Sequence, residues 1–351
     1  MLCAFFVFLS FGGEQTPQNR DMARRKIVQH RILDLAVTLF VIVVITTLRA
    51  TLFPAGDESI PNTPTPIGSL LQGFEQSFPT LSVIAWAMML MLAALDAGRY
   101  GPKFSLYPAY TLMAIPVFGV TAGAVMVSGE FLLSGVAMML MLFGTKYLLR
   151  CIMRTESFND LSLSMLCYGT LPLVFAPAAL LYIALPLLIL GVRNTWRDWV
   201  VSLASLLFPI LSVSYWGWCA GEGFMATGEQ IYTSMFTPSE FSFFSTLNIA
   251  GIALLGVIIV MVLCAISLII SDRYSLKVKS RAVMRFNAMM LAVTLAMFLM
   301  PGCTATLFAI VAAPVAILTP IIFVRMSVGF TEMLYRLLLI AAAANMVVMA
   351  L

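Results

Sequence analysis

The stretch LSLSMLCYGTLPLVFAPAALLYIALPLLILGV, from Leu161 to Val192, decides the fold of this chain. It is 32 residues long and contains no charged side chain. As one helix it would be about 48 Å long, which exceeds a hydrocarbon core about 30 Å thick. Pro172 and Pro177 remove helix hydrogen bonds near its middle, so we expect two short membrane spans joined by a tight turn.

The composition of the whole chain points to the same environment. Of 351 residues, 61% are hydrophobic and 10% are charged, whereas a soluble domain carries about 25% charged residues. His30 is the only histidine, which excludes multi-histidine metal sites, and the six cysteines form no C-x-x-C pair. We expect a membrane protein that binds no nucleic acid.

Outward from the first stretch, further apolar segments follow at intervals that fit membrane spans. Phe286–Phe323 is again too long, at roughly 57 Å, and is expected to break at Pro301 and Gly302. The other segments are Leu35–Phe53, Phe78–Leu95, Leu106–Val127, Phe131–Leu149, Trp199–Trp218, Leu247–Ile270 and Met333–Leu351. The pattern predicts an all-α fold, a polytopic transmembrane helix bundle of about 11 spans.

Charge gives the expected orientation, because cytoplasmic loops collect Lys and Arg. With the N-terminus inside and the C-terminus outside, nearly every basic residue falls on the inner side, and Arg49 alone falls outside. The outer segments carry acids, namely Asp57, Glu58, Glu75, Glu130, Glu222, Glu229 and Glu240. We therefore predict a multi-pass membrane protein whose basic loops face the cytoplasm.

The chain divides into a tail and one membrane domain. Residues 1–34 are predicted to form a basic cytoplasmic tail, and residues 35–351 a single transmembrane domain. MARRKIVQHR, from Met22, resembles the usual basic lead-in to a first span, so residues 1–21 are interpreted as an upstream extension.

The first outer loop, RATLFPAGDESIPNTPTP, holds the candidate catalytic residues Asp57 and Glu58. Their carboxylates suit a general base toward an acceptor hydroxyl, or oxygen ligands for a divalent cation, and no other cofactor is expected. Arg49 is a candidate for gripping a phosphate, and Glu75 for assisting in substrate binding. The alternatives are a solvated turn for GDES and snorkelling to headgroups for Arg49.

This arrangement resembles the membrane glycosyltransferases that use polyprenyl-phosphate sugars. Those enzymes also begin with a short inner tail, one span and an outer loop bearing a catalytic acid. The resemblance implies a lipid-linked substrate and catalytic roles for Asp57 and Glu58. The large soluble domain of many such enzymes has no counterpart here.

A second resemblance begins at about Ser157, with FNDLSLSMLCYGTLPLVFAPAALLYIALPLLILGVRNTWRDW and later LKVKSRAVMRF and FAIVAAPVAILTPIIFV. It is to an uncharacterised family of polytopic inner-membrane proteins, a domain of unknown function, in Gram-negative gut and gliding bacteria. The family stretch R-x-x-x-R-[ED]-W matches Arg193, Arg197, Asp198 and Trp199. The resemblance implies this architecture and a multi-pass protein of the bacterial inner (plasma) membrane, and it implies no defined activity. Arg197 is a candidate phosphate-binding residue, with an interfacial anchor as the alternative.

Three functions stay open. The first is a glycosyltransferase-like enzyme of cell-envelope glycan or polyprenyl-linked chemistry, and the second is a non-catalytic envelope-assembly component. The third is a transporter or flippase, suggested by the proline-interrupted spans. The bilayer is the expected partner, and the sequence does not decide the substrate, the oligomeric state or whether the chain is an enzyme.

Overall fold

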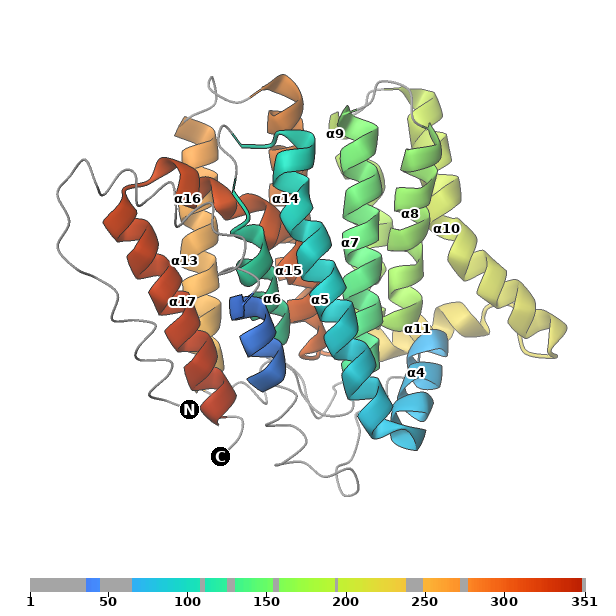
Figure 1. The fold of residues 1–351 in the computed structure, drawn as a ribbon. Coiled ribbons are helices and arrows are strands. Elements are labelled where there is room, and N and C mark those ends of the chain that lie inside the picture. Colours follow the sequence, from blue (N-terminus) through green and yellow to red (C-terminus); the bar gives the residue numbers. More distant parts are fainter. Residues whose placement is uncertain are drawn as a thin grey trace.

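The protein is a bundle of helices, and most of the longer ones run side by side (Figure 1). The computed structural model describes residues 36–44, 65–107, 111–124, 130–153, 158–192, 195–237, 249–271 and 277–348. Within these ranges every regular element is a helix, and no strand occurs. The predicted all-α class is therefore confirmed.

Residues 36–44 form a helical segment that carries no label in Figure 1. The labelled helices begin with α4 (Pro66–Ser77), α5 (Pro79–Phe104), α6 (Ala114–Gly123), α7 (Phe131–Met153), α8 (Phe158–Val174), the short 3₁₀ helix η1 (Ala176–Ala179) and α9 (Leu180–Val192). They continue with α10 (Trp196–Cys219), α11 (Ala226–Phe236), α13 (Ile249–Ser271), α14 (Val278–Met297), α15 (Thr306–Leu318), α16 (Pro320–Arg325) and α17 (Val328–Val348).

Six helical segments of the described ranges are long and apolar enough to cross a membrane. They are α5, α7, α10, α13, the run Thr306–Arg325 that covers α15 and α16, and Gly329–Val348 within α17. By length and composition, these are the features of a membrane protein.

The two overlong apolar stretches are interrupted near their prolines. The first stretch divides into α8 and α9, with η1 between them and Phe175 in an extended conformation. The second divides into α14 and α15, and the intervening residues form turns. Proline and glycine explain both interruptions, because neither supports a continuous ladder of helix hydrogen bonds.

The stretch Leu106–Val127 differs from its prediction as one full span. Among its described residues, 106–107 and 111–124, the α-helical ones are the ten of α6, and all ten are buried. The chain before α6 runs inside the bundle, where the Tyr107 hydroxyl donates a hydrogen bond of 2.5 Å to the carbonyl oxygen of Ile317 on α15. Irregular backbone is tolerated at such depth because protein, and not lipid, surrounds it.

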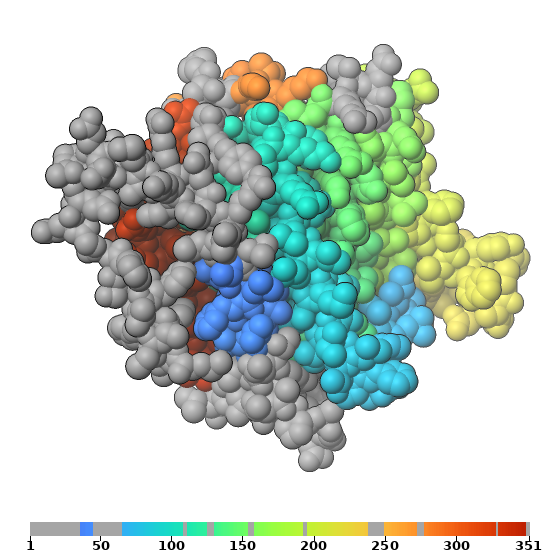
Figure 2. All heavy atoms as spheres, viewed as in Figure 1, coloured from blue at the N-terminus to red at the C-terminus, as the bar shows by residue number. Residues whose placement is uncertain are grey.

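The core of the bundle forms around α15. Every residue of α15 is buried, and the helix packs against α6, α7 and α14. By contrast, α10 lies at the side of the bundle, and the chain from its end into α11 projects outward (yellow in Figure 2). Exposed aromatic side chains mark both ends of α10, with Trp196 at its start and Trp216 and Trp218 near its end, as in the interfacial belts of membrane proteins.

Candidate functional site

One end of the bundle gathers buried carboxylates, and we call it the acidic end. It comprises α4 and the first residues of α7 and α15. Glu75 on α4 is 5% exposed, and its two carboxylate oxygens accept hydrogen bonds from the backbone N–H groups of Phe131 (3.2 Å) and Leu132 (3.1 Å). These N–H groups open α7 and have no partner within the helix, so Glu75 caps α7 and opposes the positive end of its dipole.

Glu130 lies directly before α7 and is fully buried. Its Oε2 atom accepts a hydrogen bond of 2.9 Å from the hydroxyl of Thr306, the first residue of α15. The other carboxylate oxygen, Oε1, and the Thr304 hydroxyl are both buried without a hydrogen-bond partner in the described part of the chain. The Thr304 side chain nevertheless lies close enough to the carboxylate to lower its pKa, so Glu130, Thr304 and Thr306 form one buried polar group at the start of α15.

The surroundings of Glu130, which lies outside the apolar span of α7, shift its proton affinity. Burial raises the pKa of its carboxyl from an ordinary 4.5 to about 7, and the nearby Glu75 charge adds to this rise. The side chains of Thr306 and Thr304 act in the opposite direction and favour the charged form. A carboxyl with a pKa near neutrality is suited to take up and release protons at physiological pH.

The sequence-predicted site residues fall in three places. Asp57, Glu58 and Arg49 lie outside the described residues. Glu75 lies at the acidic end, beside Glu130, which the sequence marked only as one of several outer acids. The burial of Glu130 and its contact with Thr306 depend on residues far apart in the chain, so no local pattern signals them.

Arg197 lies at the opposite end of the bundle from Glu75. Its guanidinium is 4.2 Å from the centroid of the Phe158 ring, at the start of α8. The other end of α8 adjoins α4, since the Thr65 hydroxyl donates to the carbonyl oxygen of Val174 at 3.0 Å. These contacts are separated by α8, about 25 Å long. Arg197 and Glu75 therefore lie at opposite ends of α8 and do not bind one small group together; the sequence likewise assigned Arg197 to the inner side and Glu75 to an outer segment.

No group of three or more His, Cys, Asp or Glu side chains suited to a metal ion occurs in the ranges that the structure describes. Asp57 and Glu58, the expected ligands of a divalent cation, lie outside those ranges.

A polar network inside the bundle was not anticipated from the sequence. Lys146 on α7 donates to Asp96 on α5 at 2.7 Å, and both side chains are about one-fifth exposed. The Tyr100 hydroxyl lies 3.1 Å from the same Asp96 oxygen and 3.2 Å from the carbonyl oxygen of Leu142. The sequence places Asp96 directly after one apolar stretch and Lys146 within another, so only the packing of α5 on α7 brings them together.

No family model, curated protein or solved structure matches this chain. The class that the fold defines is an all-α protein with helices fit to cross a membrane.

Proposed function

We propose that this chain is a multi-pass protein of the bacterial inner membrane that acts in cell-envelope glycan chemistry on polyprenyl-phosphate-linked substrates, as membrane glycosyltransferases do. The observation that carries this proposal is Glu130, a fully buried carboxyl that accepts a hydrogen bond from Thr306 and lies near a second buried acid, Glu75. It lies at the end where the acids of the outer segments gather. Acid–base groups of this kind cluster at functional sites.

The proposed threading has about 11 crossings, with the N-terminus inside and the C-terminus outside. Its support is the alternation of helix directions. The starts of α7 and α15 meet at the acidic end through Glu130 and Thr306. The end of α5 and the start of α14 meet at the other end, where Lys103, Lys277 and Lys279 line one cavity. Basic residues favour the cytoplasmic side, so the acidic end is assigned to the outer face.

In the proposed reaction, a hydroxyl oxygen of the acceptor attacks the anomeric carbon of the lipid-linked sugar. The bond from that carbon to the phosphate oxygen breaks, and polyprenyl phosphate leaves with the bonding electron pair. The acceptor proton passes to a carboxylate. Asp57 and Glu58 are the proposed catalytic residues, whose carboxylates act as general base toward the acceptor hydroxyl, and Arg49 holds the phosphate. Glu130 is the proposed buried proton acceptor and Glu75 its neighbour, whose charge raises the pKa of Glu130.

The test replaces Glu130 by Gln in the full-length protein and measures envelope glycan in cells that lack the native copy. Gln keeps an oxygen that accepts the Thr306 hydrogen bond but takes up no proton. We expect glycan to be lost with Glu130→Gln and with Asp57→Ala/Glu58→Ala, at unchanged membrane levels of the protein. Glu229→Gln, an exposed acid on α11, is the matched control. Normal glycan in both test variants would refute the enzymatic proposal.

A non-catalytic assembly component is the second candidate, and the capping contacts favour it. Glu75 and Glu130 both bind the first residues of neighbouring helices, which is a structural role. On this hypothesis Glu130→Gln retains full function, because the accepted hydrogen bond survives. The variant thus separates proton transfer from helix packing.

A further inference from the structure

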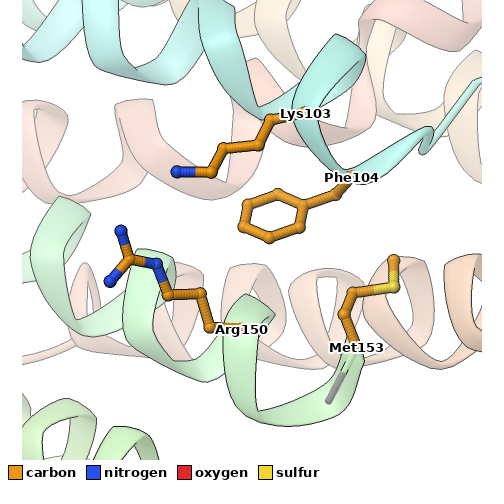
Figure 3. Close-up of a pocket in the computed structure, with 4 residues that line it drawn as sticks. All are labelled: Lys103, Phe104, Arg150 and Met153. Carbon is orange, nitrogen blue, oxygen red and sulfur yellow. The ribbon is translucent and has the colours of Figure 1, made fainter.

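A cavity of about 370 Å³ lies between the last turns of α5 and α7. Its lining includes Lys103 and Phe104 from α5 and Arg150 and Met153 from α7. In Figure 3 the nitrogen-bearing ends of Lys103 and Arg150 extend on one side of the Phe104 ring, while Met153 lies on the other. The space therefore has a cationic side and an apolar side.

A neighbouring cavity of about 380 Å³ shares Lys103, Phe104 and Met153 and reaches the start of α14, where its lining includes Lys277, Val278, Lys279 and Ser280. Two contacts fix α14 against the other helices. The Lys279 ammonium donates to the carbonyl oxygen of Met153 at 2.6 Å, and the Ser280 hydroxyl donates to that of Ser105 at 3.3 Å. We call the two cavities together the basic pocket.

The basic pocket carries four cationic side chains, and no Asp or Glu is among its described lining residues. Asp96, seven residues before Lys103 on α5, already accepts hydrogen bonds from Lys146 and Tyr100. Four like charges that line two adjoining cavities repel one another, and a bound anion would relieve that repulsion.

The start of α14 adds to the positive potential. This 20-residue helix has no side chain capping its N-terminus and no acid in its first turn. Its first backbone N–H groups have no partners within the helix, and they form the positive end of the helix dipole. Helix starts of this kind bind phosphate groups, and here the start of α14 borders the same cavity as the Lys side chains.

We infer that the basic pocket binds the phosphate group of an anionic molecule, with Lys103, Arg150 and the start of α14 facing the phosphate oxygens. If the ligand is a phospholipid, Phe104 and Met153 provide an apolar wall for its acyl chains, while its headgroup phosphate faces the cationic side. A free phosphate compound would use the same cationic side. The pocket lies at the opposite end of the bundle from Glu130, so this inference does not depend on the proposed function.

The test measures retention of phosphatidylglycerol by purified full-length protein, using native mass spectrometry, with zwitterionic phosphatidylcholine for comparison. A second arm measures thermal stabilisation by inorganic phosphate. The variants are Lys103→Gln/Arg150→Gln and, from another helix, Lys277→Gln/Lys279→Gln. The control is Arg99→Gln/Arg285→Gln, which removes the same charge from exposed positions outside the lining. The thermal midpoint of each variant without ligand identifies any that fails to fold.

We expect each pocket variant to weaken phosphatidylglycerol binding about thirtyfold, because it removes two cationic contacts from the site of the phosphate, each of which contributes about 1 kcal/mol. The control should bind as the native protein does. A loss in the lipid arm alone identifies a headgroup as the ligand, and a loss in the phosphate arm alone identifies a free phosphate compound. Equal effects of pocket and control variants, or no effect in either arm, would overturn the inference.

Discussion

Lys146 and Asp96 join two apolar helices, α7 and α5, through an ion pair of 2.7 Å. Tyr100 donates to the same carboxylate, so Asp96 is hydrogen-bonded to two partners. Each charge lies within an apolar helix, where an unpaired charge is expensive. The pair therefore fixes how α5 and α7 pack, beyond what apolar contact alone specifies.

Replacing Asp96 by Asn is expected to destabilise the protein by about 2 kcal/mol, because it leaves the partly buried Lys146 without its counter-charge. Thermal unfolding in detergent measures the change. Lys146→Met should partly rescue Asp96→Asn, since no charge then remains. If the two substitutions destabilise the protein additively, the pair has no coupling energy, and this account of α5 and α7 is wrong.

The stability of the protein should depend on pH through Glu130. Its folded-state pKa, about 7, lies above its ordinary value of 4.5, so the folded state favours the protonated carboxyl. The resulting stabilisation is fully present below about pH 4.5 and is lost as the pH rises through about 7.

Thermal midpoints measured between pH 5 and pH 8 check this expectation. The native protein should lose more stability across that interval than Glu130→Gln, which does not titrate. Identical pH profiles for the two proteins would show that Glu130 is charged in the folded state throughout.

At Gly169 the backbone of α8 lies close to the backbone of α10. A Cβ atom added there would collide with the carbonyl oxygen of Leu206, a backbone atom that moves only with its helix. Gly169→Ala is therefore expected to cost about 1–3 kcal/mol through overpacking. Gly191→Ala is the control, because its Cβ would meet nothing within 4 Å. Equal unfolding midpoints for the two variants would contradict this packing.

The proposed threading predicts the behaviour of topology reporters. Alkaline phosphatase fused after Leu351 should be active, since the enzyme works only outside the cytoplasm. The same enzyme fused within residues 193–194, between α9 and α10, should be inactive there. A fluorescent protein that matures only in the cytoplasm should give the reverse pattern. An active phosphatase at residues 193–194 would invert the proposed assignment of the two ends.

Much of the architecture could be predicted from the sequence. A low charge content and long apolar stretches require helices, because backbone groups in lipid must be satisfied within their own segment. The prolines near Val174 and at Pro301 also indicated where helices end. The site was less predictable. Glu75 was expected near the substrate, but its role as cap of α7 needs the position of Phe131, 56 residues away.

The sequence by itself thus determined that the chain folds as apolar helices fit to cross a membrane, and that its two overlong stretches are interrupted near their prolines. Only the tertiary structure decided which helix forms the core. The span of α13 has a mean hydropathy of 3.2, and 33% of it is buried. The span Thr306–Arg325 has a lower mean hydropathy, 2.6, yet 94% of it is buried. Lipid chains are as apolar as leucine side chains, so hydropathy does not separate a lipid-facing helix from a central one. Close packing and pairs such as Glu130–Thr306 and Asp96–Lys146 make that distinction, and they exist only once distant segments meet.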